Sequence, residues 1–148
     1  MDINNSNWRV RKAAILNDKY LTKTEKWFDI RLEDGELDHE PGQFVQVELF
    51  GIGESPISIC SSPTKKGSFE LTVRAAGRVT TQMHKLKKGD FIGIRGPFGK
   101  PFPVRTMVGN DLLFVAGGLG LAPLRSLINY VIDNRREFGK VDILLGSK

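Results

Sequence analysis

The segment Leu112–Pro123, LLFVAGGLGLAP, limits what this chain can fold into more than any other stretch of its sequence. A short apolar run ends in three glycines within four positions, and an Ala-Pro pair then opens an amphipathic segment. This pattern predicts a strand, a tight turn and the start of a helix. Bare backbone at Gly117, Gly118 and Gly120 lets a phosphate approach the N–H groups and dipole of that helix. A glycine-rich turn that binds nothing is the alternative interpretation, because the spacing is not the usual G-x-G-x-x-G.

Length and composition indicate a globular protein. A chain of 148 residues suits one domain, or one domain with part of a second, and 40% hydrophobic residues is an ordinary content. There is no run of eighteen apolar residues and no secretory pattern at the start, so we expect neither membrane insertion nor export, and a cytoplasmic location. The single cysteine, Cys60, excludes an intramolecular disulfide and a four-cysteine metal or iron–sulfur site within the chain.

The net charge of +5 is partly local, because six bases face only Asp90 between His84 and Arg105. The six bases are Lys85, Lys87, Lys88, Arg95, Lys100 and Arg105. Such a patch can steer an acidic protein partner, although a run like this is more often only a solvated loop face. The chain has no zinc-finger spacing, aromatic RNA-stacking motif or basic heptad helix, so no nucleic-acid partner is expected.

The first two thirds of the chain contain short segments of alternating or apolar residues with Gly and Pro between them. The predicted strands are Trp8–Leu16, Trp27–Leu32, Phe44–Phe50, Ile57–Ser61, Phe69–Arg74 and Phe91–Arg95. Strands at this spacing predict a closed antiparallel barrel of six strands. One short helix is predicted among them, at Thr80–Leu86.

The pattern changes after Pro103. The apolar run Leu112–Ala116 predicts a parallel strand covered on both faces, and the helical period of Ala122–Phe138 is followed by a second strand at Val141–Leu145. These elements form a single βαβ unit, a partial α/β domain, with a boundary near Pro101–Gly109 that divides the chain into residues 1–105 and 106–148.

A lone βαβ unit leaves one edge of Leu112–Ala116 without a partner strand. Because such an edge promotes association, we expect self-association through it or partial disorder after about residue 110. The sequence is interpreted as truncated at its C-terminal end.

The segments PGQFVQVELF, SPISICSSP, VRAAGRVTTQMHKLKKGD, IRGPFGKPFP and FVAGGLGLAPLRSLI resemble the ferredoxin–NADP⁺ reductase superfamily, in family order over residues 8–148. The most similar branch holds the flavin subunits of soluble hydrogenases and sulfhydrogenases, anaerobic sulfite reductase and dihydroorotate dehydrogenase complexes. The resemblance implies a mainly β protein in which a Greek-key FAD-binding barrel precedes an NAD(P)-binding α/β domain. In that family hydride passes from nicotinamide to flavin, and electrons then pass singly to iron–sulfur centres.

What the resemblance implies for this chain is an FAD-binding electron-transfer subunit, or a fragment of one, beside an iron–sulfur or hydrogenase partner subunit. The family's remaining strands and C-terminal cysteine cluster would lie beyond Lys148, so NAD(P) binding is expected to be weak or lost. The alternatives are a non-catalytic docking module and an inactive truncated remnant that no longer binds FAD.

The first flavin motif of the family, Arg-x-Tyr/Phe-Ser, falls on Ser55-Pro56-Ile57-Ser58. Only the serine matches. Ser55 replaces the arginine that pairs with the FAD pyrophosphate, and Ile57 replaces the aromatic residue against the isoalloxazine. Positive charge for the phosphates must therefore come from other residues.

The second flavin motif falls on Val73–Thr80, where the implied cofactor-binding residues are Val73, Arg74, Ala75, Gly77, Arg78, Val79 and Thr80. Backbone N–H groups near Gly77 and the Thr80 hydroxyl would cradle the pyrophosphate, while Arg74 and Arg78 add positive charge. The alternative is that both arginines are solvated and Thr80 only caps a helix.

The glycine-rich turn is the implied dinucleotide site of the α/β domain, with Gly117, Gly118, Leu119, Gly120, Ala122 and Pro123 as its residues. The loop Gly96–Gly99 lies near the nicotinamide entry in the family, although an ordinary linker turn has the same composition. Cys60 is interpreted as a buried small hydrophobe. His39 and His84 lack the neighbours of a metal or general-base site, and Ser58 lacks a histidine base.

Overall fold

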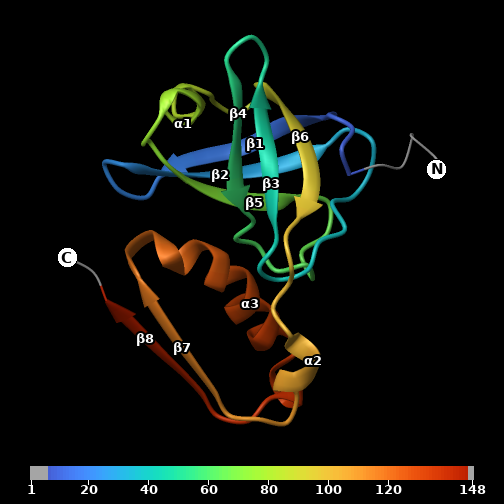
Figure 1. The fold of residues 1–148 in the computed structure, drawn as a ribbon, viewed down its shortest axis with the longest axis vertical. Coiled ribbons are helices and arrows are strands. Elements are labelled where there is room, and N and C mark those ends of the chain that lie inside the picture. The colour runs from blue at the N-terminus through green and yellow to red at the C-terminus, as the bar shows by residue number, and fades with distance from the viewer. Residues whose placement is uncertain (1–6, 147–148) are drawn as a thin grey trace.

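The computed structural model describes residues 7–146, which form two units, a β-barrel and an α/β unit below it (Figure 1). The barrel strands are β1 (Arg11–Tyr20), β2 (Glu25–Leu32), β3 (Phe44–Leu49), β4 (Gly53–Ser58), β5 (Phe69–Arg74) and β6 (Phe91–Phe98). The other elements are α1 (Arg78–Met83), α2 (Val104–Met107), β7 (Leu112–Gly117), α3 (Leu121–Asp133) and β8 (Val141–Gly146), with 3-10 turns at Gly118–Gly120 and Arg135–Glu137. Within residues 7–146 no helix has the length and hydropathy needed to cross a membrane.

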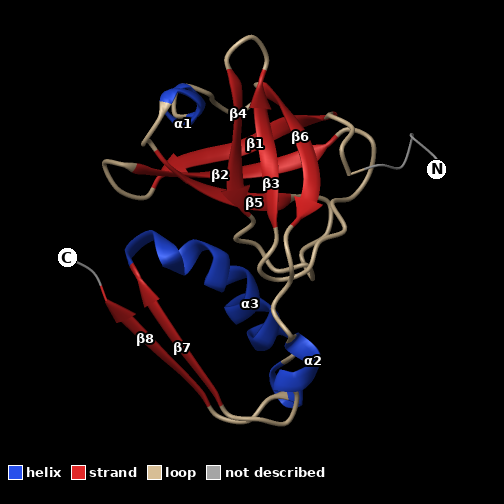
Figure 2. Cartoon of the chain, in the orientation of Figure 1, coloured by secondary structure: helices blue, strands red, loops and turns tan. Residues whose placement is uncertain are grey.

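The six barrel strands form one antiparallel sheet in the order β4-β3-β6-β1-β2-β5 (Figure 2). Its two edge strands meet just after β4 ends, where Ile59 forms an isolated bridge with Leu71. The Cys60 N–H donates to the Glu70 carbonyl at 2.9 Å in the same place. The predicted mainly β fold is therefore confirmed. These two contacts, and not a continuous ladder of hydrogen bonds, join the two edges of the sheet.

Alternation along the strands places the barrel core. In β2 and β3 every second side chain points inward, because successive residues of a strand face opposite sides of the sheet. The largest fully buried apolar side chains of the barrel are Phe28, Ile15, Ile30, Ile59, Leu71, Met83, Ile92, Ile94, Val45, Val47 and Val73. Met83 seats α1 on this core.

A buried lysine also holds α1 against the barrel. Lys26 is on the inward face of β2 and is only 3% exposed, so its charge needs partners. Its Nζ lies 2.8 Å from the Asp18 carboxylate and donates to the carbonyls of His84 and Leu86, which follow α1. The hydrogen bond from Lys26 lowers the pKa of Asp18. The barrel therefore positions the helix through hydrogen bonds from Lys26 to the backbone that follows it and through apolar contact with Met83.

The parallel strands β7 and β8 form a small sheet, and α3 packs on one of its faces. The core there is a separate cluster of Phe114, Leu127, Ile128, Val131 and Phe138. The opposite face is open, since Leu113, Val115 and Leu144 are 61%, 65% and 57% exposed. The prediction that the β7 run is covered on both faces is wrong for the described chain, because α3 is the only long helix packed on this sheet.

The free edge of β7 matches the sequence prediction. Among the described residues β8 is the only strand that pairs with β7. Residues 112–146 nevertheless form regular elements, so the expected partial disorder is not observed. Self-association through that edge stays a prediction.

Several element boundaries differ from those predicted. The strand placed at Ile57–Ser61 begins earlier, as β4, and its Pro56 is tolerated because β4 is an edge strand that pairs only with β3. The first strand begins at Arg11 and continues to Tyr20, past a register shift between Ile15 and Asn17. The limits also shift at α1, which covers Arg78–Met83, and at α3, which ends at Asp133. The short α2 had no periodic signal.

The contact between Gly42 and Phe102 links the barrel to the segment that leads into the α/β unit, and it is testable. Gly42 has φ +97°, and a Cβ built there would lie 2.7 Å from Phe102 Cδ2. Gly42→Ala is expected to lower the free energy of unfolding by about 2–4 kcal/mol, combining a left-handed backbone with a clash. Urea unfolding measures the change.

Gly51→Ala is the matched control for that variant. Gly51 also has a positive φ, +76°, but a Cβ there meets nothing within 4 Å. Gly51→Ala is expected to lower the free energy of unfolding by the backbone term alone, about 1–2 kcal/mol. Equal losses in the two variants would show that the approach of Phe102 to Gly42 contributes nothing.

Candidate cofactor-binding site

A cavity of about 1030 Å³ lies between the barrel and the α/β unit, and we call it the interface cavity. It is lined by Leu21, Thr22, Glu25, Thr72, Arg74, Gly117, Gly118, Leu119, Leu121, Ala122, Arg125 and Gly146. The first five belong to the β1–β2 turn, β2 and β5, and the others to the end of β7, the glycine turn, α3 and the end of β8. A cavity of this size, with apolar walls and a few charged groups, is of the kind that holds cofactors.

The glycine turn forms the α/β wall of the interface cavity. Gly118 has φ +51° and open space where a Cβ would stand, so bare backbone faces the cavity there. α3 begins at Leu121 with Pro123 in its first turn and no acidic residue there. The helix dipole is therefore not neutralised by a carboxylate, which favours an anion at this wall. Of the predicted residues, Gly120 and Pro123 do not line the cavity.

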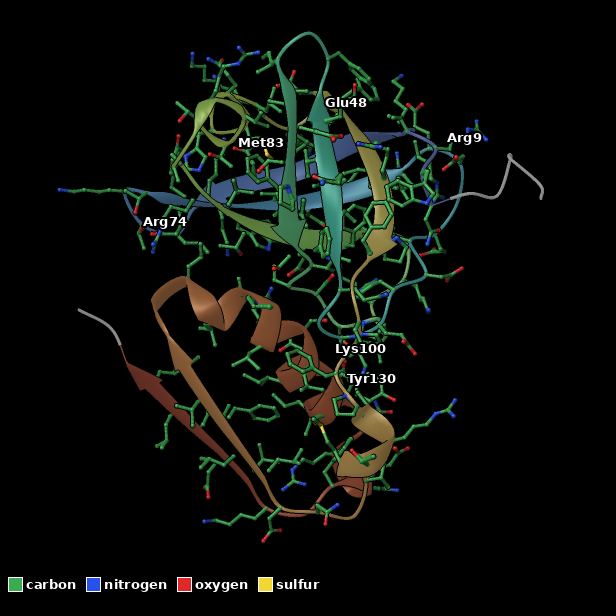
Figure 3. The ribbon with its side chains drawn as sticks, viewed as in Figure 1. Arg9, Glu48, Arg74, Met83, Lys100 and Tyr130 are labelled. Carbon is green, nitrogen blue, oxygen red and sulfur yellow. The ribbon has the colours of Figure 1, made fainter. Side chains whose placement is uncertain are left out.

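Arg74 forms the barrel wall opposite this turn. Its Nε donates to the Glu25 carboxylate at 2.6 Å, across the β2–β5 pairing. Hydrogen bonds from Thr22 and then from Arg74 lower the pKa of Glu25. Figure 3 shows Arg74 at the edge of the barrel nearest the start of α3. Of the residues predicted from the second flavin motif, Arg74 is the one that lines the interface cavity.

The other residues of the second motif lie around the start of α1. Thr80 Oγ1 accepts hydrogen bonds from the N–H groups of Ala76 and Gly77, at 3.1 and 2.9 Å. Arg78 donates to the Ile52 carbonyl, and Val79 packs against the barrel core. Thr80 therefore caps this turn, and a phosphate would compete with its hydroxyl for two of the N–H groups.

The first flavin motif lies on β4, away from the interface cavity. Ile57 pairs with Val45 and Ser55 with Val47, whose side chains belong to the core. Ile57 itself is 8% exposed and is part of that core. Pro56 is exposed and Ser58 is half-buried. The structure thus brings Arg74 and the glycine turn together and keeps this motif apart.

A charged seam between the two units was not predicted from the sequence. Arg125 Nη1, on α3, donates to the Glu70 carboxylate of β5 at 2.5 Å, and Lys65 Nζ donates to Glu70 at 2.8 Å. Ser126 Oγ donates to the Ser61 carbonyl at 2.6 Å. The only local signal was the position of Arg125 and Ser126 within the glycine-turn segment, because their partners are more than fifty residues away.

Burial alone would raise the pKa of Glu70. The hydrogen bonds from Lys65 and Arg125 outweigh burial and lower that pKa to about 2. Glu70 is therefore a carboxylate at neutral pH, and it fixes both cations at the junction of the two units.

The remaining candidates are structural in the described residues. Cys60 is buried, which raises the pKa of its thiol. The His39 ring nitrogens face the carbonyls of Leu37 and Ser61, and His84 Nε2 lies 2.8 Å from the Val73 carbonyl. Residues 7–146 contain no cluster of three His, Cys, Asp or Glu able to hold a metal ion. The predicted loop at Gly96–Gly99 is wrong, because Gly96–Phe98 forms the end of β6 and only Gly99 follows that strand; none of these residues lines the interface cavity.

The barrel and the glycine-turn unit together have a ferredoxin reductase-like architecture. A ferredoxin NADP⁺ reductase from Neisseria gonorrhoeae superposes with a TM-score of 0.78 at 22% identity, covering 92% of this chain and 56% of that structure. Phthalate dioxygenase reductase gives a TM-score of 0.79 at 15% identity, covering 94% and 44%. The family model of the oxidoreductase FAD-binding domain matches residues 13–102. The chain belongs to this family.

Curated relatives are more similar in sequence. The chain is 50% identical over 145 residues to sulfhydrogenase 1 subunit gamma of Pyrococcus furiosus, covering 95% of this chain and 50% of that protein. It is 37% identical over 115 residues to a probable dihydroorotate dehydrogenase B (NAD(+)) electron transfer subunit of Methanocaldococcus jannaschii, covering 78% and 40%. The chain spans about half the length of the curated relatives it matches. The predicted family resemblance is confirmed.

The low pKa of Glu70 predicts a pH dependence of stability. Because that pKa is about 2 in the fold and ordinarily 4.5, the carboxylate contributes fully above 4.5, and its contribution is lost as the pH falls through about 2. Urea unfolding is expected to show Glu70→Gln less stable near neutral pH, with a gap that narrows as the pH is lowered from 4.5.

Glu33→Gln is the control, since Glu33 forms an exposed pair with Lys12 at 3.2 Å. Removing an exposed pair is expected to change the free energy of unfolding by at most about 1 kcal/mol. A gap for Glu70→Gln that stays constant with pH would contradict the assignment.

Proposed function

We propose that this chain binds FAD and serves in electron transfer, as part of a flavin subunit like the gamma subunit of sulfhydrogenase. The observation that supports this most is the interface cavity, which has a barrel of the FAD-binding family on one side and a phosphate-type glycine turn on the other. In the bound state FAD would accept hydride from a nicotinamide and release single electrons to an iron–sulfur centre.

The residues present fit such a cofactor. Leu21, Leu119 and Leu121 supply apolar wall for a planar ring, while Arg74 and the N-terminal end of α3 supply positive potential for phosphates. Glu25 holds Arg74 in place, so its guanidinium is oriented before a ligand arrives. Closure of the cavity by both units would exclude water from the ring.

The partner and the second cofactor follow from the same proposal. Relatives are named as subunits of sulfhydrogenase and of dihydroorotate dehydrogenase B, so we propose an iron–sulfur or hydrogenase partner subunit for this chain. A nicotinamide dinucleotide would approach from the side of Gly117–Ala122 and bind more weakly than FAD.

The test is the visible absorption spectrum of the purified protein, before and after incubation with FAD and desalting. Retained bands near roughly 370 and 450 nm, which belong to the flavin itself, are the expected result. Bleaching on addition of NADH or NADPH would then test electron transfer. A protein that never retains FAD would contradict the proposal and leave a docking module or an inactive remnant.

Two arginine variants test where FAD binds. Arg74→Ala is expected to weaken FAD binding by about 10- to 100-fold, as removal of one charge-assisted hydrogen bond does. Arg78→Ala is the matched control, because Arg78 lies on α1, bonds to the Ile52 carbonyl and does not line the interface cavity. Quenching of flavin fluorescence measures both affinities. FAD affinities that are equal and unchanged in both variants would remove Arg74 from the site.

A further inference from the structure

Arg125 is the second arginine of the interface cavity, and it lies on the wall opposite Arg74. It belongs to the second turn of α3, whereas Arg74 ends β5. The side chain of Arg125 is 41% exposed, although it forms an ion pair between the two units. Part of this side chain is therefore open to the interface cavity that it lines.

The hydrogen bonds of Arg125 use one end of the guanidinium. Nη1 donates to the Glu70 carboxylate at 2.5 Å and to the Cys60 carbonyl at 3.3 Å, and it lies 3.5 Å from Cys60 Sγ. In residues 7–146 neither Nη2 nor Nε of Arg125 has a hydrogen-bond partner. A guanidinium has five N–H donors in a planar fork, so donors remain for a ligand.

The charge around Arg125 is arranged in a row. Asp29 and Glu70 both accept from Lys65 at 2.8 Å, and Glu70 also accepts from Arg125. Glu70 therefore shares its charge between two cations and does not neutralise Arg125 alone. Of these four residues only Arg125 lines the interface cavity, so the positive end of the row faces the cavity.

We propose that Arg125 binds the pyrophosphate of a dinucleotide in the interface cavity while its Nη1 stays fixed to the barrel. One guanidinium then joins the two units and recognises the ligand. Its free donors match the paired oxygens of a pyrophosphate, and the bare backbone of Gly117 and Gly118 lies on the same wall. The inference rests on the proposed function for its biological ligand. FAD and NAD(P)H both carry a pyrophosphate, and the experiment distinguishes them.

The test compares four variants with the unmodified chain: Arg125→Gln, Arg125→Lys, Glu70→Gln and Arg136→Gln. Arg136 is an exposed arginine of the same unit, outside the cavity lining, and serves as the matched control. Three probes are titrated: FAD by flavin fluorescence, NADH by its own fluorescence, and inorganic pyrophosphate by calorimetry. Far-UV circular dichroism and urea midpoints establish that each variant is folded.

Arg125→Gln is expected to weaken pyrophosphate and one of the two dinucleotides by about 10- to 100-fold. The dinucleotide affected identifies the source of the bound pyrophosphate. Arg125→Lys keeps the charge and loses the planar fork, so an intermediate loss is expected. Glu70→Gln keeps the guanidinium and its hydrogen bond to the Cys60 carbonyl, so its loss of affinity is expected to be smaller than that of Arg125→Gln. Arg136→Gln is expected to match the unmodified chain.

If Arg125 only joined the two units and did not contact the ligand, the variants would show a different pattern of affinities. Glu70→Gln and Arg125→Gln would then change the affinities equally, because each breaks the same ion pair, and this result would overturn the inference. Unchanged affinity of Arg125→Gln for all three probes would also overturn it. Failure of the unmodified chain to bind FAD would contradict the proposed function alone, since the pyrophosphate titration still decides the role of Arg125. Absence of pyrophosphate binding by the unmodified chain would overturn the inference.

Discussion

The backbone of Ile59–Ser61 is hydrogen-bonded from both units, and the arrangement of the molecule depends on it. On the barrel side the N–H groups of Ile59 and Cys60 donate to the carbonyls of Gln43 and Glu70 at 3.1 and 2.9 Å. From α3, Arg125 and Ser126 donate to the carbonyls of Cys60 and Ser61. Buried backbone groups must be paired, so one short segment closes the barrel and seats the helix. The interface cavity exists because this segment sets where α3 meets the barrel.

Both arginines of the interface cavity are held by carboxylates on the barrel. Glu25 holds Arg74, and Glu70 holds Arg125. Long side chains lose considerable conformational freedom when they bind a ligand, and here part of that ordering is present in the folded chain. The carboxylates also moderate the positive potential between the two walls. The same pairs that stabilise the fold thus orient the groups available to an anion.

Local sequence patterns were sufficient to predict most helices and strands but not the residues that line the interface cavity. Trp27–Leu32 and Phe44–Phe50 alternate because one face of each strand is buried, so their period is visible in the sequence. The predicted limits of β4 were wrong because Gly53, Glu54 and Pro56 show no such period. The pairing of this strand with β3 decides where it begins and ends. The glycine turn was located by composition. The Arg125–Glu70 pair was not, because it joins residues 55 positions apart that meet only through the fold.

The two hydrophobic cores share no residue, and this separation affects how the molecule unfolds. Apolar burial is the main source of stability, and it lies within each unit, whereas the seam consists largely of hydrogen bonds and ion pairs. Cooperativity between the units is therefore weak. The smaller core of the α/β unit is expected to melt first while the barrel persists, so no single melting temperature describes the chain. A ligand that bridges the cavity would add the missing coupling and make the two transitions converge.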